Sequence, residues 1–399
     1  MIPVPLNIGI LGSTGSIGQN TLRVVDRFPG RFRVTALAAS RNVDLLAAQV
    51  RKYRPEVVAL IDSSQGDALR AQLGDYYGRI FVDPDSLCEM AAWPSIQTLV
   101  VAVVGFAGAA PTLAAIDAGK NIALANKETL VAAGAVVMPR ARQRGVTIAP
   151  IDSEHSAVWQ CLRAGAHEEV RKIILTASGG PFRNRPLETF AAITPAEALN
   201  HPTWRMGPRI TIDSATMMNK AFEIIEATWL FDLTPDQIDV VIHPQSVVHS
   251  MVEYQDGSVI AQLGSPDMTL PIAYALLAPE RPEGVTGPQT LDMTKANTLE
   301  FTPPDLARYP ALDLARRALA MGPTACAVLN AADEIAVAAF LDGHLPFTGI
   351  VDQIGETLTA HKPVSDPCFD DIVAADRWAR DYVTGHLPGT PAKAVASTR

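Results

Sequence analysis

The first 150 residues alternate short, continuously apolar runs with stretches of helical periodicity. Continuously apolar runs are typical of parallel strands that are covered by helices on both faces, and their alternation with helices predicts successive βαβ units. We therefore expect residues 1–150 to form a Rossmann-like, doubly wound parallel sheet in a chain of the α/β class. The predicted strands are Ile8 to Leu11, Phe32 to Ala38, Val57 to Ile61, Thr98 to Val104, Ile122 to Ala125 and Thr147 to Ala149.

The pattern changes after this region and predicts a central α+β domain over residues 151–278. An irregular stretch from Ser178 to Gly207 is rich in Gly, Pro, Asn and Arg, and a loop of that length is usually functional. A helical pattern runs from Asn219 to Phe231. The strand-like segments Val240 to Ile242, Ser250 to Tyr254 and Ser258 to Leu263 follow, the last two joined by Asp256-Gly257, which suits a hairpin turn.

The last part of the chain is predicted to be a small helical bundle. Prolines and glycines recur too often over residues 279–310 for a long helix, which indicates a linker. Three segments with helical periodicity and alanine-rich apolar faces predict a helical domain over residues 311–385, and we expect residues 386–399 to be a frayed tail. The helical patterns are Leu312 to Ala320, Thr324 to Leu341 and Ile350 to His361.

Charge and cysteine usage exclude several classes of partner and site. The net charge is −9 and the basic residues are scattered, so we expect neither nucleic acid nor a membrane surface as a partner. The four cysteines are far apart and form no Cys-x-x-Cys pair, which argues against a zinc knuckle, a redox motif or a disulfide framework. We find no signal peptide and no stretch long enough to span a membrane, so we expect a cytoplasmic protein.

A glycine-rich turn follows the first predicted strand. Gly12, Gly15 and Gly18 are spaced by three residues and precede a helical pattern. Glycines permit a tight turn, and the N–H groups and partial positive charge at the helix start favour a pyrophosphate. The alternative is an ordinary turn between a strand and a helix. The position at the first strand of a βαβ series favours the dinucleotide site.

The end of the second predicted strand indicates which dinucleotide would bind. An NAD-binding domain normally has Asp or Glu there for the ribose 2′-hydroxyl, whereas this chain has Ser40-Arg41-Asn42. An arginine can pair with a 2′-phosphate and stack on the adenine, and its polar neighbours can add hydrogen bonds. This favours NADP over NAD. The alternative is that Arg41 is an ordinary solvated surface residue.

Asp152-Ser153-Glu154-His155 follows the last predicted strand of the first domain. Asp152 and Glu154 are two residues apart, and on an extended segment their carboxylates can converge on one divalent cation. The same pattern also occurs as a helix N-cap followed by an acidic first turn. His155 either supports a ligand of the cation or is an ordinary buried histidine. The sequence leaves both pairs of alternatives open.

A further polar group lies in the helical pattern after Asp213. Asn219 and Lys220 are one turn before Glu223, so an amide, an ammonium and a carboxylate share one helix face. Their neighbours are apolar, and polar groups in such surroundings are costly unless they serve a site. The alternative is a solvated helix face with an ordinary Lys and Glu pair.

Taken together, these residues resemble the 1-deoxy-D-xylulose 5-phosphate reductoisomerase family. The resemblance runs nearly end to end. Six segments carry it: Gly12 through Gly18, Leu124-Ala125-Asn126-Lys127-Glu128, Asp152-Ser153-Glu154-His155, Ser178-Gly179-Gly180-Pro181-Phe182, Asp213 through Lys220, and Ile242-His243-Pro244-Gln245-Ser246. The Ser40-Arg41-Asn42 loop departs mildly from the Gly-Lys-Asn of many members but keeps the positive charge.

The resemblance implies a role for each matching position. NADPH would contact Thr14, Gly15, Ser16, Ile17, Ser40, Arg41, Asn42, Asn126, Glu128 and Gly207. A Mg²⁺ or Mn²⁺ ion would be bound by Asp152, Glu154 and Glu223. The substrate would contact Lys127, Ser153, Glu154, Ser178, His201, Trp204, Ser214, Asn219, Lys220 and Glu223, of which Lys127, Glu154 and His201 are the catalytic candidates.

The implied reaction converts 1-deoxy-D-xylulose 5-phosphate to 2-C-methyl-D-erythritol 4-phosphate for isoprenoid synthesis. The metal would act as a Lewis acid on the chelating substrate, the skeleton would rearrange by retro-aldol cleavage and re-aldolisation, and NADPH would reduce the resulting aldehyde. Lys127 is suited to stabilise negative charge on oxygen, and Glu154 or a water to move protons. Residues 178–207, with Trp204, resemble a lid that excludes water. A homodimer is also implied.

Two other functions remain to be tested. An NADP-dependent semialdehyde dehydrogenase can show a similar glycine-rich turn, but it needs a nucleophilic cysteine, and Cys161 lies in an apolar helical pattern. A non-catalytic NADP-sensing protein would keep the cofactor fold without the chemistry. His243 and His249 are interpreted as structural residues.

Overall fold

The computed structural model describes residues 4–200, 207–286, 290–295 and 298–387. The chain divides into two compact units that each combine segments far apart in the sequence. The first unit comprises residues 1–129, 137–170 and 249–297, and the second comprises residues 130–136, 171–248 and 298–399. The division into three successive domains stays a prediction. Each unit is described below by itself.

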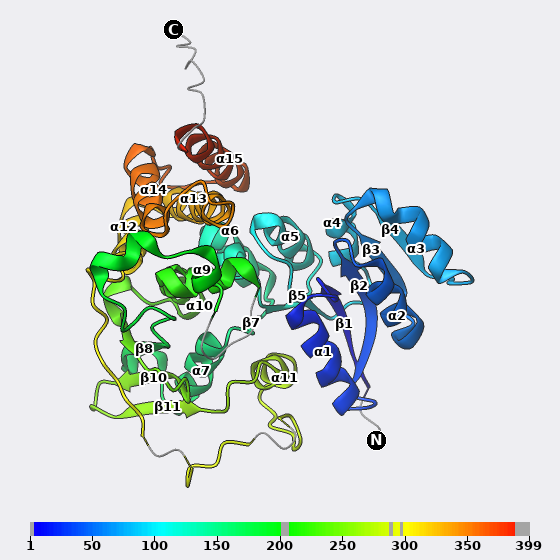
Figure 1. The fold of residues 1–399 in the computed structure, drawn as a ribbon. Helices are drawn as coiled ribbons and strands as arrows, with labels where there is room; N and C mark the ends of the chain where they lie inside the picture. Colours follow the sequence, from blue (N-terminus) through cyan, green and yellow to red (C-terminus); the bar gives the residue numbers. More distant parts are fainter. Residues whose placement is uncertain (1–3, 201–206, 287–289, 296–297, 388–399) are drawn as a thin grey trace. The chain divides into compact units, whose positions relative to one another are not determined.

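A seven-stranded parallel sheet forms the centre of the first unit (Figure 1). Its order is β4-β3-β2-β1-β5-β6-β7, so the direction of winding reverses between β1 and β5. The predicted Rossmann-like fold is confirmed. The strands are β1 (Leu6–Leu11), β2 (Phe32–Ala39), β3 (Val57–Leu60), β4 (Arg79–Val82), β5 (Thr98–Val101), β6 (Asn121–Leu124) and β7 (Ile148–Pro150).

Helices cover this sheet on both faces. All four residues of β3 are buried although neighbouring side chains of a strand point to opposite faces, which requires cover on each side. Ile272, Leu276 and Leu277 join the same core, and Figure 1 shows their helix beside α1. The helices of this unit are α1 (Ser16–Arg27), α2 (Val43–Tyr53), α3 (Gly66–Leu73), α4 (Ser86–Ala91), α5 (Ala109–Asp117), α7 (Ser153–Cys161) and α11 (Thr269–Leu277).

The strand β4 was not predicted from the sequence. It has only four residues, it lies at the edge of the sheet, and only Phe81 among them is buried. It therefore lacks the continuous apolar run that marks the strands in the middle of the sheet. Helix α6 (Lys127–Arg144) starts in the first unit, and its residues 130–136 belong to the second.

A second sheet has four strands, β8 (Val170–Ala177), β9 (Ile238–Ile242), β10 (Val248–Tyr254) and β11 (Val259–Leu263). In the first unit, β10 and β11 are neighbours joined by the short turn at Gly257, too short for a parallel connection, so they form the predicted hairpin. In the second unit, β8 and β9 pair in parallel, with Ile173 opposite Ile238 and Ala177 opposite Ile242. The sheet is mixed, as an α+β region requires.

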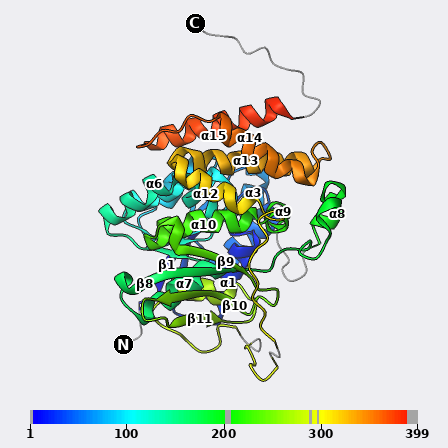
Figure 2. The same ribbon diagram turned by 90° about the vertical axis from the view of Figure 1, so that its left-hand side faces the viewer.

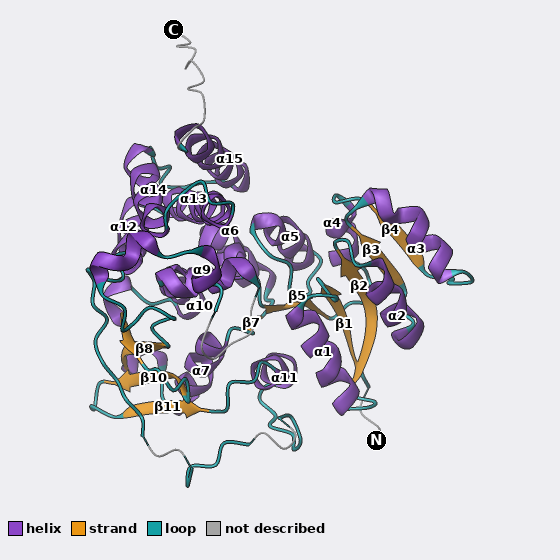
Figure 3. Cartoon of the chain, viewed as in Figure 1, coloured by secondary structure: helices purple, strands orange, loops and turns teal. Residues whose placement is uncertain are grey.

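The second unit is dominated by helices (Figure 2). The helix α13 packs against α12, α14 and α15, and no helix is found in the described residues between α11 and α12 (Figure 3). The predicted C-terminal helices are confirmed, and α15 is an addition, missed because charged residues surround its narrow apolar face. The helices are α8 (Pro195–Ala198), α9 (Pro208–Thr216), α10 (Met218–Phe231), α12 (Ala311–Met321), α13 (Pro323–Leu341), α14 (Phe347–Ala360) and α15 (Phe369–His386).

The expectation that no segment is long enough to span a membrane is wrong for α13. Among the described residues, this one helix has the length and mean hydropathy of a candidate span. However, 78% of its apolar window is buried inside the structure. A core helix with apolar residues on all sides accounts for that composition.

The described part of the predicted irregular stretch, residues 178–200, is less irregular than its composition suggests. It contains the short α8 and one of the six 3₁₀ turns found among the described residues. Phe182 and Phe190 pack against Phe347 with ring centroids 5.4 and 6.0 Å apart, which attaches the stretch to α14. The 3₁₀ turns are η1 (Ser63–Gln65), η2 (Phe106–Gly108), η3 (Leu162–Ala164), η4 (His167–Glu169), η5 (Leu187–Ala192) and η6 (Pro235–Gln237).

Candidate functional site

The glycine-rich turn lies at the carboxyl end of β1, where the winding of the sheet reverses. In α/β sheets this is the position that binds ligands. Gly15 is the N-cap of α1, and no side chain caps that helix start. Gly15 and Ser16 are exposed, and Thr14 and Ile17 are half-buried. The first N–H groups of α1 are therefore open to an anion, as the sequence predicted.

Two of the glycines are required by close backbone contacts. A Cβ at Gly12 would lie 2.5 Å from the carbonyl oxygen of Ala102, and Gly12 also has a φ of +86°. A Cβ at Gly18 would lie 2.3 Å from the oxygen of Gly12. Gln49 of α2, which sequence reasoning missed, anchors the turn: it accepts from Ser13 Oγ at 2.7 Å and donates to Ser13 O at 2.9 Å. A buried polar residue among apolar helix positions is the signal that identifies it.

The Ser40-Arg41-Asn42 segment connects β2 to α2 at the same edge of the sheet. All three residues are exposed. The side chain of Arg41 is 84% exposed, and its Nε lies 3.7 Å from Oδ2 of Asp62. An ion pair that long and that exposed holds a guanidinium weakly, so it leaves Arg41 available for a phosphate. Asn42 caps α2 by accepting from the N–H of Leu45 at 3.1 Å.

Asn126 and Glu128 support the loop that follows β5. Asn126 is 1% exposed, and its amide donates to the oxygens of Val103 and Gly105 at 3.1 and 2.9 Å. One oxygen of Glu128 accepts from the N–H of Gly105 at 2.9 Å and the other from Asn126 at 2.7 Å. These contacts fix the shape of the loop beside Gly12, because the amide of Asn126 donates to the loop backbone and to Glu128.

A cluster of charged side chains lies where β6 and β7 end. Lys127, in the first turn of α6, is 8% exposed and its Nζ lies 3.1 Å from Oδ2 of Asp152. Glu154 and Ser153 are half-buried, and Ser153 Oγ donates to Glu154 at 2.5 Å. His155 is fully buried, with Nδ1 4.0 Å from Asp152. The structure thus brings an ammonium, two carboxylates and a hydroxyl together at the ligand-binding edge of the sheet.

Of the two alternatives for the segment that carries Asp152 and Glu154, the structure shows a helix start and not an extended segment. Asp152 is the N-cap of α7, and its Oδ1 accepts from the N–H of Glu154 at 3.1 Å. The capping alternative is therefore confirmed. Capping does not exclude cation binding, because each carboxylate oxygen has two lone pairs and Glu154 remains half-buried.

In the second unit, a glycine turn after β8 and a left-handed residue after α9 shape the surroundings of Ser178 and Ser214. The turn after β8 has two glycines with positive φ, and a Cβ at Gly180 would lie 2.8 Å from the oxygen of Ser214. Tyr309, also missed from the sequence, fixes the turn by donating to the oxygen of Gly179 at 2.8 Å. Met217 adopts left-handed angles with φ of 63°, which lets α10 start directly after α9. Ser214 is half-buried beside this junction.

The first turns of α10 hold the predicted amide, ammonium and carboxylate together. Asn219 donates to Oε1 of Glu223 at 2.5 Å, and Lys220 forms an ion pair with Oε2. The side chains of Lys220 and Glu223 are 3% and 1% exposed. The predicted shared face is confirmed, and the alternative of a solvated ion pair is wrong, because burial makes each charge depend on its partner.

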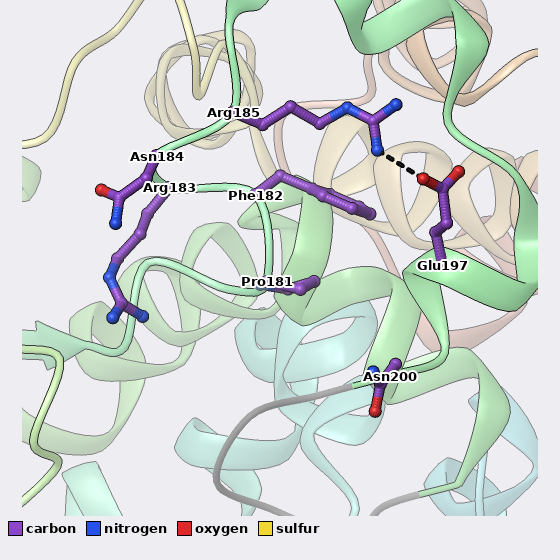
Figure 4. A pocket seen from close by; sticks show the side chains of 7 residues that line it. All are labelled: Pro181, Phe182, Arg183, Asn184, Arg185, Glu197 and Asn200. Carbon is purple, nitrogen blue, oxygen red and sulfur yellow. Dashed lines mark hydrogen bonds and ion pairs between the residues drawn. The ribbon is translucent and has the colours of Figure 1, made fainter.

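Not all predicted site residues are accounted for. His201 and Trp204 lie outside the described residues. Gly207 is exposed and is the N-cap of α9. A cavity of about 510 Å³ in the second unit is lined by residues between Pro181 and Asn200. Figure 4 shows that the side chains of Arg185 and Glu197 in its lining point towards each other, while those of Arg183 and Asn184 point away. None of the predicted site residues lines this cavity, so we do not assign the substrate to it.

Two further interpretations concern Cys161 and His243. Cys161 is buried, and burial raises the pKa of its thiol to about 11, which is the opposite of a nucleophilic cysteine. His243 is fully buried: Nε2 accepts from the N–H groups of Val247 and Val248 at 3.1 Å, and Nδ1 contacts the oxygen of Glu300 at 2.9 Å. Both findings agree with structural roles, and the first removes the chemical basis for a semialdehyde dehydrogenase.

Comparison with protein families gives one consistent result along the chain. Residues 8–134 match the model for 1-deoxy-D-xylulose 5-phosphate reductoisomerase. Residues 148–231 match its C-terminal domain model, and residues 263–382 match a further C-terminal domain model of the same enzyme. These matches support neither a semialdehyde dehydrogenase nor a non-catalytic NADP sensor.

Individual relatives agree with the family models. The reductoisomerase of Chlorobium phaeobacteroides is 52% identical over 94% of this chain and 98% of its own length. That of Gloeobacter violaceus is 50% identical over 98% and 99%. The Zymomonas mobilis enzyme in complex with NADPH superimposes with a TM-score of 0.89 at 43% identity, covering 95% of this chain and 98% of that one. A complex with NADPH, fosmidomycin and magnesium gives 0.90 at 41% identity, covering 95% and 97%. The chain therefore belongs to the 1-deoxy-D-xylulose 5-phosphate reductoisomerase family.

Proposed function

We propose that this protein converts 1-deoxy-D-xylulose 5-phosphate to 2-C-methyl-D-erythritol 4-phosphate with NADPH as reductant and a divalent cation as cofactor. One observation carries the proposal: Lys127, Asp152, Ser153 and Glu154 form a cluster in the same unit, and at the same sheet edge, as the glycine-rich turn. A dinucleotide in that turn would extend along the edge towards an ammonium and two carboxylates. Relatives that bear the reductoisomerase name match nearly the full length of the chain.

NADPH fits the residues at this edge. The uncapped start of α1 offers N–H groups for the pyrophosphate, contributed around Thr14, Gly15, Ser16 and Ile17. Ser40, Arg41 and Asn42 are exposed at the end of β2, where a 2′-phosphate would lie. Asn126 and Glu128 would set the shape of the loop near the nicotinamide, and Gly207 is a cofactor contact from the resemblance alone.

A Mg²⁺ or Mn²⁺ ion suits the carboxylates that the family resemblance assigns to it. Hard divalent cations prefer carboxylate oxygens, and Asp152, Glu154 and Glu223 are the proposed ligands. Each is already hydrogen-bonded in the structure, which orients its oxygens. When bound, the ion would supply Lewis acidity towards the oxygens of the substrate.

The remaining residues divide into a reacting end and a phosphate end. Lys127 would donate to substrate oxygens on which negative charge develops, and Glu154 would orient a hydroxyl or move its proton, with Ser153 as its hydrogen-bond partner. Ser178, Ser214, Asn219 and Lys220 would bind the phosphate. His201 and Trp204 stay candidates from the resemblance alone, as does a lid formed by residues 178–207. We also propose a cytoplasmic homodimer.

The test is NADPH oxidation with 1-deoxy-D-xylulose 5-phosphate, with and without Mg²⁺ or Mn²⁺, for the wild type and Glu223→Gln. Glu356→Gln is the comparison, because Glu356 is an exposed carboxylate of α14 that belongs to no proposed site. We expect metal-dependent turnover that Glu223→Gln largely loses and Glu356→Gln keeps. If folded, NADPH-binding wild-type protein oxidises no NADPH with either metal, the proposal is wrong.

A further inference from the structure

A single guanidinium in the second unit joins α9 to the C-terminal helices. Arg209 lies in the first turn of α9 with a side chain that is 21% exposed. Its Nη2 donates to Oδ2 of Asp333 at 3.0 Å and to Oδ1 of Asn330 at 3.1 Å, both on α13. Asp333 and Asn330 are fully buried. A charge-assisted contact of this kind has a defined geometry, unlike a surface ion pair.

The contact is part of a longer chain of charges. Nη1 of Arg209 lies 3.5 Å from Glu334, which also pairs with Arg380 of α15 at 2.8 Å. Arg380 in turn pairs with Asp376 at 2.7 Å. On α9 itself, Nε of Arg209 lies 3.8 Å from the carboxylate of Asp213, one turn further along. Charged side chains thus connect α15 and α13 to the second half of α9.

The position of Arg209 is unfavourable for α9 taken by itself. A cation in the first turn of a helix lies at the positive end of the helix dipole, which disfavours it. The helix gains no side-chain cap in return, because its N-cap is Gly207. The partners on α13 therefore explain this arginine: it fixes the helix in the tertiary structure.

Fixing that face of α9 also fixes the opposite one. Ser214 is five residues after Arg209, so at about 100° per residue the two side chains lie about 140° apart around the helix axis. Ser214 is half-buried, whereas its neighbours Asp213 and Ala215 are buried. A rotation of α9 about its axis would move Ser214 away from the turn at Gly180, whose backbone approaches it closely.

We infer that Arg209 is a positioning residue, which together with Asp333 fixes the rotation of α9 and so directs Ser214 at the phosphate group of the substrate. The inference rests on the proposed function, since it takes Ser214 as a phosphate ligand. Through this contact the C-terminal helices α13 and α15 support the phosphate end of the site. Arg209 acts through α9 and does not touch the substrate.

The test compares Arg209→Met with Arg316→Met. Arg316 of α12 is equally half-buried, and it joins its helix to the oxygens of Pro235 and Ile238 at 2.6 and 2.8 Å without touching α9. Both variants should unfold at lower temperature than the wild type. Only Arg209→Met should weaken binding of 1-deoxy-D-xylulose 5-phosphate, by about tenfold to a hundredfold, because losing one hydrogen bond to a charged phosphate has an effect of that size. NADPH affinity should not change.

Binding is measured by calorimetry without NADPH, so the result does not depend on turnover. A wild type that binds the sugar phosphate but does not turn over would refute the proposed function and leave this inference testable. Equal loss of binding in the two methionine variants, or a wild type that binds no sugar phosphate, would overturn the inference.

Two milder substitutions test the same contact in case Arg209→Met does not fold. Asp333→Asn keeps the shape of the partner and removes its charge, and Arg209→Lys keeps the charge but not the forked geometry. Both should raise KM for the sugar phosphate in the same direction as Arg209→Met, with kcat changed less than KM. In the double variant Arg209→Met/Asp333→Asn, the second substitution should add little. Additive effects would contradict a shared role.

Discussion

In the first unit the ammonium of Lys127 pairs with a carboxylate that is 17% exposed, whereas in the second unit Lys220 pairs with a carboxylate that is 1% exposed. Both pairs have the same chemistry, and both lie at the first turn of a helix. The first pair is therefore more accessible to water than the second, in which each charge depends more strongly on its partner.

The same contrast applies to the carboxylates. The oxygens of Glu223 accept from Asn219 and Lys220, so their directions are set before any ligand arrives. Glu154 has Ser153 as its hydrogen-bond partner on a half-buried surface. The carboxylate of Glu223 is therefore more strongly held in one orientation than that of Glu154.

The largest expected effect separates the two pairs by stability. Lys220→Met leaves the carboxylate of Glu223 buried without its cation, which should lower the free energy of unfolding by about 3–5 kcal/mol. Lys127→Met leaves a carboxylate whose side chain is 17% exposed, so the loss should be smaller, about 1–3 kcal/mol. Urea unfolding at neutral pH measures both. Arg183→Met, which removes a surface cation outside both pairs, is the control, and equal losses for the two lysines would contradict the comparison.

Enzyme activity should also distinguish the two pairs, but here the larger effect on kcat is expected at Lys127. Lys127→Met should lower kcat by about 10² to 10³, the usual effect of removing a group that stabilises developing oxyanion charge. Its KM for the sugar phosphate should change little. Lys220→Met should act mainly on KM, because a phosphate ligand is used in the ground state as well as in the transition state. Steady-state kinetics with saturating NADPH gives both values, and a purely KM effect at Lys127 would reverse the assignment.

The sequence predicts the first unit better than the second for a physical reason. Parallel strands covered on both faces are continuously apolar, so β1, β2 and β3 can be read directly, while β4 at the exposed edge cannot. The helix α15 was missed because charged residues separate Ile372, Ala375 and Ala379 along its narrow buried face. A local sequence pattern therefore identifies a strand or helix only where all of its residues have the same kind of environment.

The site residues show which features the local sequence can predict and which it cannot. Spacing predicts that Asn219, Lys220 and Glu223 share a helix face, since helix geometry alone decides it. It cannot predict that Asp152 begins a helix, because a capping residue and an extended ligand have the same local sequence. Nor can it predict which groups Gln49 and Tyr309 contact, because those partners are distant in sequence and known only from the fold.

The next prediction compares one glycine of each unit, and its expected effects are smaller. In Gly18→Ala the new Cβ would lie 2.3 Å from a backbone oxygen, so the turn must shift. Overpacking of this kind costs about 1–3 kcal/mol and should weaken NADPH binding. Gly355→Ala, at a helical glycine of the second unit whose nearest neighbour would be 3.6 Å away, should instead stabilise by about 0.5–1 kcal/mol. NADPH fluorescence titration and unfolding midpoints test both, and unchanged NADPH affinity in Gly18→Ala would argue against a cofactor role for the turn.

The smallest predicted effect concerns Glu197, which is an exposed carboxylate of the second unit, in contrast to the buried Glu223. The backbone N–H of Thr194, the guanidinium of Arg185 and the hydroxyl of Thr194 lower the pKa of Glu197 to about 2 from an ordinary 4.5. A carboxylate with a lowered pKa contributes stability above its unfolded-state pKa and loses it as the pH falls towards its folded-state pKa. The difference in unfolding free energy between the wild type and Glu197→Gln should therefore be constant at neutral pH and disappear as the pH falls from about 4.5 to about 2. Because Glu197 is exposed, the difference should be far smaller than for Lys220→Met at any pH. A difference that persists below this window would show that packing of the side chain, rather than its charge, stabilises the start of α8.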